Sequence, residues 1–372
     1  MRASQSQMLR FRQLVLCALV PALLSAAQEP SPKETPGTGE FKIIENVKYV
    51  TVPVTVFNKD GNFVNGLLPK DFRVFDNGRE QSVSQDVETQ PVSLVVLVQA
   101  NTYMEAILPK IYKIGSLLDA LVVGETGEAA VIKFDHRVET VQDFTSDSAK
   151  ITEAIKKIKP GSSSVRLNDA MMAGINLLKS KPKGRRRVIL AIAQTKDVGS
   201  EMRPRYVMEE AQFKDVIIYS VNVSRSLAAV TTRNPTPPRP PAIPPSAGHS
   251  TAGGGALNPT TQMQNTGVGN ALPLFAEIFH QAKSLFVDNP LEVYTKWTGG
   301  EEHGFLSQGG LERAVAQIGD EIHSQYLLTY RLPDQVTGGY HDIRVDVMRP
   351  DLKVRTRPGY WIAGPAEEKQ KK

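Results

Sequence analysis

The amino-acid sequence predicts an α/β protein with a mostly parallel sheet covered by helices on both faces and a small antiparallel β-domain. In the middle of the chain, continuously apolar strands alternate with helical segments, which is typical of a buried parallel sheet. Runs that favour β-strands, with turn dipeptides between them, occur at both ends, in 41–90 and 326–363. Because each set alone is thin for a stable sheet, we expect the two sets to pair.

The first 27 of the 372 residues have the pattern of an export signal. An apolar stretch, Leu14–Leu24, precedes the small residues Ser25-Ala26-Ala27, which suit a cleavage site. The stretch is short for a membrane span, and Pro21 interrupts it, so we favour a cleaved signal over a retained anchor. We therefore predict an exported protein in the periplasm, outer envelope or exterior, with no integral membrane span after cleavage.

Cleavage after Ala27 would remove Cys17, the only cysteine, so the mature chain could form neither a disulfide nor a thiolate site. The formal net charge of +5 would fall to +2, because the signal carries three arginines and no acid. So small a charge does not indicate a nucleic-acid partner.

A basic run precedes the apolar strand near 188–193. It consists of Lys179, Lys181, Lys183, Arg185, Arg186 and Arg187. We interpret it as a solvated loop whose charges flank an aggregation-prone strand. An anion site is the alternative.

The N-terminal half of the β-domain is predicted at 41–90, after a Pro/Gly-rich leader at 28–40 that we expect to be disordered. Alternating apolar and polar residues turn at Asp60-Gly61 and again at Asn77-Gly78, as in antiparallel hairpins. Pro53 lies inside the first run, which suggests an edge strand.

The α/β domain is predicted at 91–325. Its expected strands are 94–98, 129–134, 188–193 and 216–223, and its expected helices are near 104–121, 147–158, 168–180 and 204–213. Asp147 and Asn168 are the predicted helix caps.

A Pro-rich and then Gly-rich insertion at 226–270 interrupts this rhythm and is expected to be disordered. Helical segments with one apolar face follow near 272–286 and 309–325, separated by a shorter helix that stops at Gly299-Gly300. The strands of 326–363 complete the β-domain, and 364–372 is a charged tail.

Several of these stretches resemble the von Willebrand factor type A (vWA) domain, and more narrowly the secreted bacterial "VWFA-related" family found in acidobacteria. They are "FRVFDNG", "SLVVLVQANTYM", "SSSVRLNDAM", "RRVILAIAQTKD", "YTKWTGG" and "SQYLLTYRL". Their order and spacing carry the resemblance, which covers about 46–224 and 287–361. The family implies a doubly wound, Rossmann-like sheet with a small β-domain.

In this family the first strand normally ends in Asp-x-Ser-x-Ser, a metal-ion-dependent adhesion site completed by a Thr and a further Asp. The resemblance places Gln99, Asn101, Tyr103, Val165 and Gln194 at those positions. Magnesium needs carboxylate charge and hard oxygen ligands, and this set contains no carboxylate. We therefore expect a degenerate site with no metal and no other cofactor.

Two questions about this face stay open from the sequence. A displaced cation could be held by Asp197 and Asp169, although Asp197 could equally be an exposed loop acid. The amides of Gln99, Asn101 and Gln194 could either bond one another and fill the old cavity or form a working binding face.

No sequence motif indicates an enzyme. The chain lacks H-E-x-x-H, G-x-S-x-G and the phosphate-binding G-x-x-x-x-G-K-[ST], and its six histidines are scattered. We therefore expect a non-catalytic, adhesion-type interaction module with a protein partner. The alternatives are a structural scaffold in an envelope or secretion assembly and, less favoured, a hydrolase.

Overall fold

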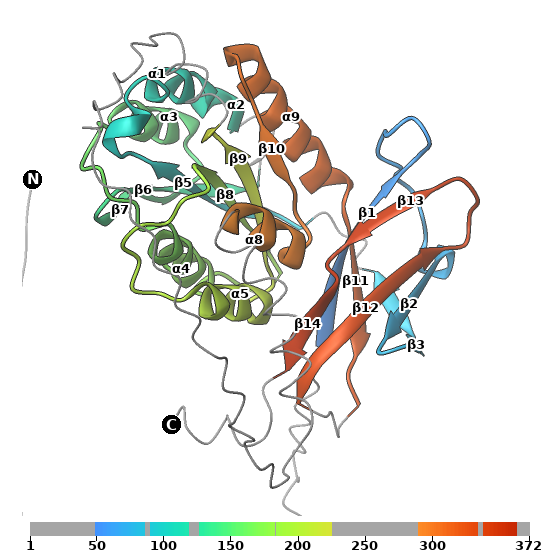
Figure 1. Cartoon of the computed structure of the whole chain (residues 1–372). Coiled ribbons are helices and arrows are strands. Elements are labelled where there is room, and N and C mark those ends of the chain that lie inside the picture. Colours follow the sequence, from blue (N-terminus) through green and yellow to red (C-terminus); the bar gives the residue numbers. More distant parts are fainter. Residues whose placement is uncertain are drawn as a thin grey trace, which may run out of the picture. The chain divides into compact units, whose positions relative to one another are not determined.

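The structure is a computed structural model that describes residues 49–85, 90–118, 126–182, 184–224, 289–333 and 338–362 (Figure 1). Several predicted segments lie outside the described residues, namely the export signal (1–27), the leader (28–40), the insertion (226–270), the helix near 272–286 and the tail (364–372). Among the described helices, none combines the length and apolar character needed to cross a membrane.

Within the described residues, the α/β sheet has six strands in the order β10-β9-β8-β5-β6-β7. All neighbours pair in parallel except β6 and β7, which are antiparallel. The strands are β5 (Val92–Gln99), β6 (Glu128–Phe134), β7 (Val138–Thr145), β8 (Arg186–Ala193), β9 (Val216–Asn222) and β10 (Glu302–Gly304). Strand β7 was not predicted from the sequence, but the predicted mostly parallel sheet is confirmed.

Helices cover both faces of this sheet (Figure 1). One face carries α4 (Leu167–Leu178), α5 (Pro204–Phe213) and α8 (Pro290–Thr298). The other carries α1 (Leu108–Ile111), α2 (Gly115–Leu118), α3 (Ser148–Lys156) and α9 (Gln308–Ser324), together with the 3₁₀ turns η2 (Thr102–Met104) and η3 (Tyr112–Ile114). The doubly wound arrangement is therefore confirmed.

The apolar run at β5 reflects burial on both sides. Every residue of β5 is buried, and alternate side chains join the two apolar clusters: Leu94 and Val96 join the cluster on the side of α1, α3 and α9, whereas Val95 and Leu97 join the cluster on the side of α4. A strand at the centre of a parallel sheet has no solvent face, so it shows no polar alternation.

The segment predicted to be helical near 104–121 is not one continuous helix. Its described part is divided into the short pieces η2, α1, η3 and α2. Pro109 lies in the first turn of α1 and cannot donate a backbone hydrogen bond to a preceding turn, so the helix cannot run through it. Gly115 begins α2 where a Cβ would approach the backbone of Thr152 to 2.9 Å.

One predicted helix cap is correct and the other is wrong. Asp147 caps α3, since its Oδ1 accepts the backbone N–H groups of Ala149 and Lys150. Helix α4 instead begins after Arg166, which leaves Asn168 inside the first turn and buried. Its side chain bonds to other elements, described below.

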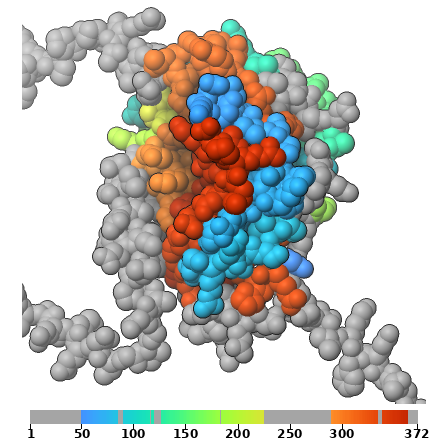
Figure 2. Space-filling model, turned by 90° about the vertical axis from the view of Figure 1, so that its right-hand side faces the viewer, coloured from blue at the N-terminus to red at the C-terminus, as the bar shows by residue number. Residues whose placement is uncertain are grey.

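The β-domain consists of two sheets, ordered β13-β1-β11-β4 and β14-β12-β2-β3. Their strands are β1 (Tyr49–Phe57), β2 (Phe72–Asp76), β3 (Arg79–Gln81), β4 (Val83–Gln85), β11 (Tyr326–Arg331), β12 (Gly339–Val347), β13 (Lys353–Thr356) and β14 (Gly359–Ile362); η1 (Pro69–Asp71) precedes β2. Strands from the two ends of the sequence pair antiparallel in both sheets, as predicted: β1 and β4 pair with β11, β1 also with β13, and β2 with β12. Figure 2 shows strands of the two ends side by side in blue and red.

The predicted turn at Asn77-Gly78 is confirmed. Strands β2 and β3 pair across it, with Asp76 opposite Arg79, and both turn residues have positive φ, 49° and 76°. Two consecutive residues with positive φ are the requirement of a type I′ hairpin, which explains the Asn-Gly dipeptide.

The edge-strand prediction for Pro53 is wrong, because β1 lies between β11 and β13. The proline is tolerated because pairing with β13 begins one residue later, at Val54 opposite Thr356. At Pro53 itself only β11 is a ladder neighbour, through Leu327. The proline of this central strand thus stands at a position that has a paired strand on one side only, so its missing N–H breaks no ladder hydrogen bond to β13.

A buried carboxylate joins the two parts of the fold. Glu321 of α9 is 1% exposed and accepts hydrogen bonds from Thr55 Oγ1 of β1 (3.2 Å) and Tyr219 Oη of β9 (3.1 Å). It also forms an ion pair with Arg355 of β13. Elements of both the α/β sheet and the β-domain therefore meet at one side chain.

A second buried carboxylate lies inside the β-domain. Asp76 Oδ2 accepts the hydroxyl groups of Tyr330 and Tyr360, both at 2.7 Å, and Oδ1 lies 2.7 Å from His341 Nδ1. Burial alone would raise the pKa of Asp76, but the contacts with His341 and the two tyrosines outweigh it and hold the pKa below its usual value of 3.8.

We predict that Asp76→Asn lowers the free energy of unfolding at pH 7 by roughly 3 kcal/mol, because it breaks a buried, hydrogen-bonded charge. A carboxyl with a lowered folded-state pKa stabilises the fold above its unfolded pKa, and this stabilisation is lost as pH falls. The difference from the parent should therefore shrink below about pH 4. Urea unfolding at pH 7, 5 and 3 measures it.

The matched control is Asp346→Asn, a half-exposed acid on β12, which should change the stability by less than about 0.5 kcal/mol at each pH. A difference between Asp76→Asn and the parent that stays constant from pH 7 to pH 3 would contradict the role given to the ionised carboxylate.

Candidate functional site

The six residues singled out by the sequence lie at the carboxyl edge of the parallel sheet. Parallel strands end at one edge, and loops beyond that edge are where α/β folds place their sites. Gln99 ends β5, and Gln194 directly follows β8. The others stand in adjoining loops or turns: Asn101, Tyr103, Val165 and Asp197.

The three amides form one hydrogen-bonded group. Gln99 is fully buried, and its Nε2 donates to Asn101 Oδ1 (3.0 Å) and to Gln194 Oε1 (2.9 Å). Its Oε1 accepts the backbone N–H of Gln194 at 2.7 Å. The buried Asn101 Nδ2 has no hydrogen-bond partner among the described residues. The space beyond the end of β5 is thus occupied by neutral amide groups.

Tyr103 and Val165 do not join the amide group. Tyr103 lies in η2, and its side chain is exposed. Val165 is buried and forms a β-bridge with Val198, with N···O distances of 3.2 and 2.8 Å. One side chain therefore faces solvent and the other is an apolar part of the core.

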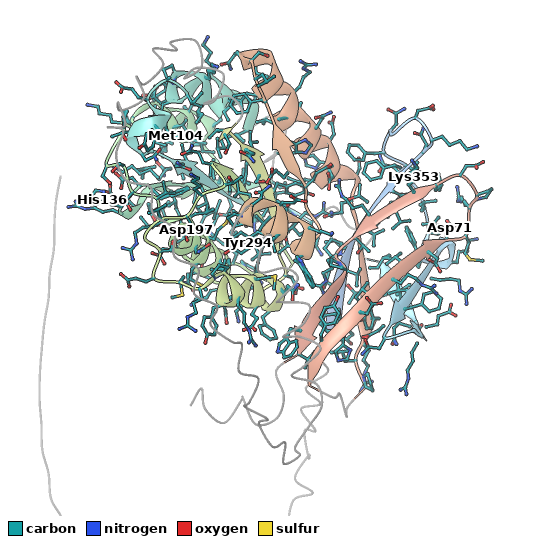
Figure 3. The ribbon with its side chains drawn as sticks, viewed as in Figure 1. Asp71, Met104, His136, Asp197, Tyr294 and Lys353 are labelled. Atoms are coloured by element: carbon teal, nitrogen blue, oxygen red, sulfur yellow. The ribbon has the colours of Figure 1, made fainter. Side chains whose placement is uncertain are left out.

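Asp197 is half-buried and bonded, not the exposed loop acid considered from the sequence. Its Oδ1 accepts the N–H of Leu167 (3.2 Å), and its Oδ2 accepts Asn168 Nδ2. Asn168 Oδ1 in turn accepts the hydroxyl of Tyr294 at 2.7 Å. Asp197 and Tyr294 are labelled in Figure 3. Burial raises the pKa of Asp197 and the nearby Asp169 adds to this, while bonds from Ser200 and Leu167 oppose it.

Asp169 is also engaged, and not with Asp197. Its Oδ2 accepts Arg166 Nε at 2.6 Å, and its Oδ1 accepts the backbone N–H of Met202 at 2.8 Å. Each carboxylate thus has its own set of donors. Neutral amides, a buried valine and two carboxylates already bonded to other groups do not fit a magnesium site, which needs several hard anionic or water oxygens in octahedral geometry.

The sequence analysis missed a further acid at this edge, Asp135, which directly follows β6. Its carboxylate accepts the N–H groups of Arg137 (2.8 Å) and Ser162 (2.9 Å) and lies 2.9 Å from His136 Nδ1. Burial would raise the pKa of Asp135, but these contacts lower it overall. A Cβ on Gly161 would lie 1.6 Å from Asp135 Oδ2, so any other residue there would displace the carboxylate from these contacts.

Asp135, His136 and Ser162 do not form a chain of nucleophile, base and acid. Ser162 contacts Asp135 through its backbone N–H, and its Oγ is buried without a hydrogen-bond partner among the described residues. Such a chain requires the hydroxyl to bond to the base. This arrangement therefore stabilises the loop without activating the serine.

Large apolar side chains are exposed on the loops at the same edge. They follow β5, β8 and β10, and they are Tyr103 (63% exposed), Val198 (60%), Met202 (40%) and Leu306 (57%). Only Tyr103 was singled out from the sequence. For Val198, Met202 and Leu306, the sequence shows only an apolar residue in a loop after a strand, and this pattern is too common to indicate a functional residue.

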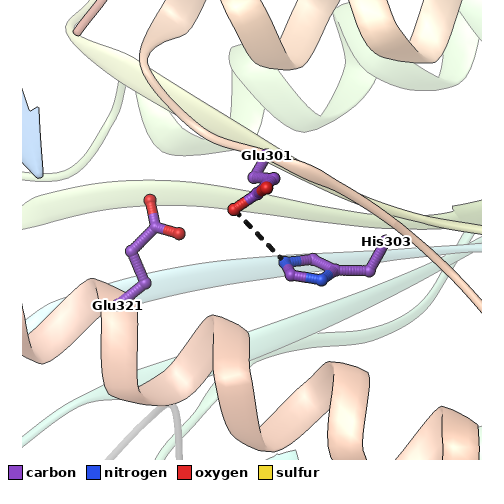
Figure 4. A group of neighbouring side chains, drawn as sticks. All are labelled: Glu301, His303 and Glu321. Carbon is purple, nitrogen blue, oxygen red and sulfur yellow. Dashed lines mark ion pairs between the residues drawn. The ribbon is translucent and has the colours of Figure 1, made fainter. Parts of the chain in front are cut away.

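Among the described residues, one group of acids and histidine has ligand atoms close enough for a metal ion: Glu301, His303 and Glu321 (Figure 4). It lies at β10 and α9, and His303 Nε2 is 3.9 Å from Glu301 Oε2. Arg355 forms ion pairs with both carboxylates. A guanidinium thus already supplies the positive charge, and the group belongs to the junction between the domains.

Residues 97–195 match the family model of the von Willebrand factor type A domain. The chain contains a vWA domain. The matched segment includes the three amides and Val165 and ends two residues before Asp197. The resemblance of this segment to the vWA domain is therefore shown. No curated protein matches the chain.

Solved structures with similarity to the chain include BatB from Bacteroides thetaiotaomicron (13% identity, 62% of this chain and 98% of that chain, TM-score 0.41). Another is an aerotolerance-related membrane protein from Bacteroides fragilis (13% identity, 62% of this chain and 99% of that chain, TM-score 0.38). A third is the vWF domain of the type V pili tip protein Mfa5 from Porphyromonas gingivalis (18%, 30% and 39%, TM-score 0.26). Similarity at this level carries no functional argument.

We predict that Gln99→Leu lowers the free energy of unfolding by about 3 kcal/mol. The reason is that it removes the partner of three polar groups, namely the buried Asn101 Oδ1 and the Oε1 and backbone N–H of the half-buried Gln194. The same substitution at Gln317, exposed on α9, should change stability by less than about 0.5 kcal/mol. Urea denaturation compares the two variants. Equal losses would mean that the amide group contributes nothing to the fold.

Proposed function

We propose that the chain is an exported, non-catalytic interaction module of the adhesion type. Its vWA domain binds a protein partner through the carboxyl edge of the parallel sheet, without a metal ion. The observation that carries the proposal is the set of exposed apolar side chains, Tyr103, Val198, Met202 and Leu306, on loops following three strands of that sheet.

These side chains suit a protein interface. Aromatic residues and methionine are enriched at interface centres, where they fill pockets on the partner. The loops that carry them are tied together: Thr102 N–H donates to Ser162 O (3.1 Å), and Ser164 Oγ donates to Val198 O (2.7 Å). A surface fixed by such bonds loses little conformational entropy on binding.

Metal independence is supported by the chemistry of the donors. Beneath the exposed side chains lies the neutral amide group of Gln99, Asn101 and Gln194. Both oxygens of Asp197 accept hydrogen bonds from Leu167 and Asn168. A dication would have to displace these bonds and exchange bound water for mostly neutral oxygens, which is unfavourable for a hard cation.

Export is supported by the sequence of 1–27, with its basic start, apolar centre and small residues at the end. After cleavage the mature chain would have no cysteine, so outside the cytoplasm it would rely on packing and buried polar bonds for stability. The Asp76 and Glu321 contacts are of this kind.

The second candidate is a structural scaffold in which the former metal site is inert. It is favoured by the complete burial of Gln99 and Asn101, which leaves neither side chain accessible to a partner. The two candidates differ in whether the exposed apolar residues above the amides are needed for binding. A hydrolase remains the least supported alternative, because Ser162 contacts Asp135 through its backbone rather than its hydroxyl.

We predict that a protein partner co-purifies with the mature chain. The double variant Tyr103→Ser/Val198→Ser should capture about tenfold less of this partner, because it removes apolar contact area. The control is Leu68→Ser/Met348→Ser, which removes two similarly exposed apolar residues of the β-domain. Mass spectrometry quantifies capture with and without EDTA. Capture abolished by EDTA, or lost equally in both variants, would contradict the proposal.

We also predict that magnesium, manganese and calcium leave the melting temperature unchanged relative to EDTA. An occupied native-state site would raise stability by RT ln(1 + [L]/Kd), about 2.7 kcal/mol at a hundredfold excess over Kd. Thermal melts of the parent and of Asp197→Ala measure the effect. An upward shift in the parent that vanishes in the variant would reveal a relocated metal site.

A further inference from the structure

A cavity of about 910 Å³ lies at the amino edge of the α/β sheet, at the opposite end of the strands from the vWA loops. Its walls come from the starts of β8 and β9, the end of α5, and strands β1, β11 and β14 of the β-domain. Its size is in the range of pockets that hold small molecules, roughly 300–1,000 Å³.

Basic side chains dominate the charge of this cavity. The described residues that line it include one acid, Asp215, and six bases: Lys179, Arg185, Arg186, Arg187, Lys214 and Arg357. Arg185 is compensated by Glu128, with an Nε to Oε1 distance of 3.3 Å. The basic run of the sequence is thus not simply a solvated loop, because its three arginines form part of a concave wall.

Arg357 carries the argument. It connects β13 and β14 and is only 4% exposed, yet it forms no hydrogen bond or ion pair with any described residue. Its guanidinium carbon lies 5.4 Å from the centre of the Tyr360 ring. Burial lowers the pKa of Arg357, although the charge of Asp215 opposes this. A buried guanidinium with unused donors is costly unless an acceptor reaches it.

Arg187 presents a second positive charge that is held in place but not neutralised by its described partners. Its Nη1 and Nη2 donate to the carbonyl oxygens of Lys214 (2.8 Å) and Lys181 (2.7 Å), and its buried Nε has no partner among the described residues. Bonds to carbonyl oxygens fix the orientation of a guanidinium and leave its charge available to an anion.

The uncharged part of the wall is mixed, since it contains polar residues such as Thr51, Gln90 and Gln212 and also an apolar and aromatic part. The apolar and aromatic part includes Val50, Leu327, Leu332, Tyr360 and Ile362. A site with fixed cationic groups and an apolar wall favours a ligand that has one anionic group and an apolar body.

We propose that this cavity binds a small organic anion whose carboxylate or phosphate group accepts the donors of Arg357 beside the charge of Arg187, with its apolar part against the Tyr360 side. Arginine presents a planar fork of donors that suits either group. The site lies at the other end of the sheet from the proposed partner surface and does not depend on it.

The test is a thermal melt of the mature chain at constant ionic strength with benzoate, phenyl phosphate, inorganic phosphate and neutral benzyl alcohol. We expect benzoate or phenyl phosphate, at about a hundredfold excess over Kd, to raise Tm by on the order of 5 °C. Inorganic phosphate should act more weakly, and benzyl alcohol should have no effect. Comparing benzoate with phenyl phosphate separates the two anionic groups.

Arg357→Met should abolish the shift while keeping or raising the Tm of the ligand-free protein, because it removes a buried uncompensated charge. Arg313→Met, at an exposed arginine on α9, should keep the full shift. If Arg357→Met does not fold, Lys214→Gln serves as the second variant and should weaken binding several-fold in calorimetric titration. No shift with any anion, an equal shift with benzyl alcohol, or undiminished binding in the cavity variants would overturn the proposal.

Discussion

The ion pair of Glu321 with Arg355 holds the two halves of this fold together. A carboxylate that is 1% exposed must have partners, and Glu321 takes them from β1, β9 and β13 while itself lying on α9. Loss of β13 would leave the charge of Glu321 buried without its cation, and loss of β1 or β9 would remove a hydrogen-bond donor to it. The β-domain is therefore fastened to the α/β sheet by electrostatics as well as by packing, and the acids and histidine that resemble a metal site serve this attachment.

The two edges of the parallel sheet differ in electrostatic character: the site at the carboxyl edge is mostly neutral, and the cavity at the amino edge is cationic. At the carboxyl edge the former metal position is filled by amides, and the remaining acids are saturated by backbone and side-chain donors. At the amino edge arginines collect around a cavity, and Arg357 has no acceptor there among the described residues. Neutral apolar loops suit a protein surface, whereas buried cations suit an anion, so the same sheet offers two chemically distinct surfaces.

Much of the architecture follows from local sequence, but the contacts that define the site do not. The continuous apolar run of β5 indicates burial on both faces, and Asn77-Gly78 specifies its hairpin because few dipeptides adopt that turn. Asn168 was predicted to be a helix cap because its actual partners, Asp197 and Tyr294, are distant in sequence. Arg357 gave no signal at all, since its burial results from the packing of two domains. Long-range polar contacts are set by tertiary structure, which single-sequence patterns do not encode.

The interleaving of N-terminal and C-terminal strands in the β-domain also constrains how the chain acquires its structure. Strands β1 to β4 are synthesised before the whole α/β domain, and their partners β11 to β14 come after it. The α/β sheet can assemble from its own strands, but Asp76 gains its partners Tyr330, His341 and Tyr360 only after the C-terminal strands have been synthesised. Until then the early hairpins have open strand edges, which other chains can pair with. A polypeptide interrupted before Tyr326 would lack β11 to β14 and leave those edges permanently open, so closure of the β-domain distinguishes chains that have these strands from chains that do not.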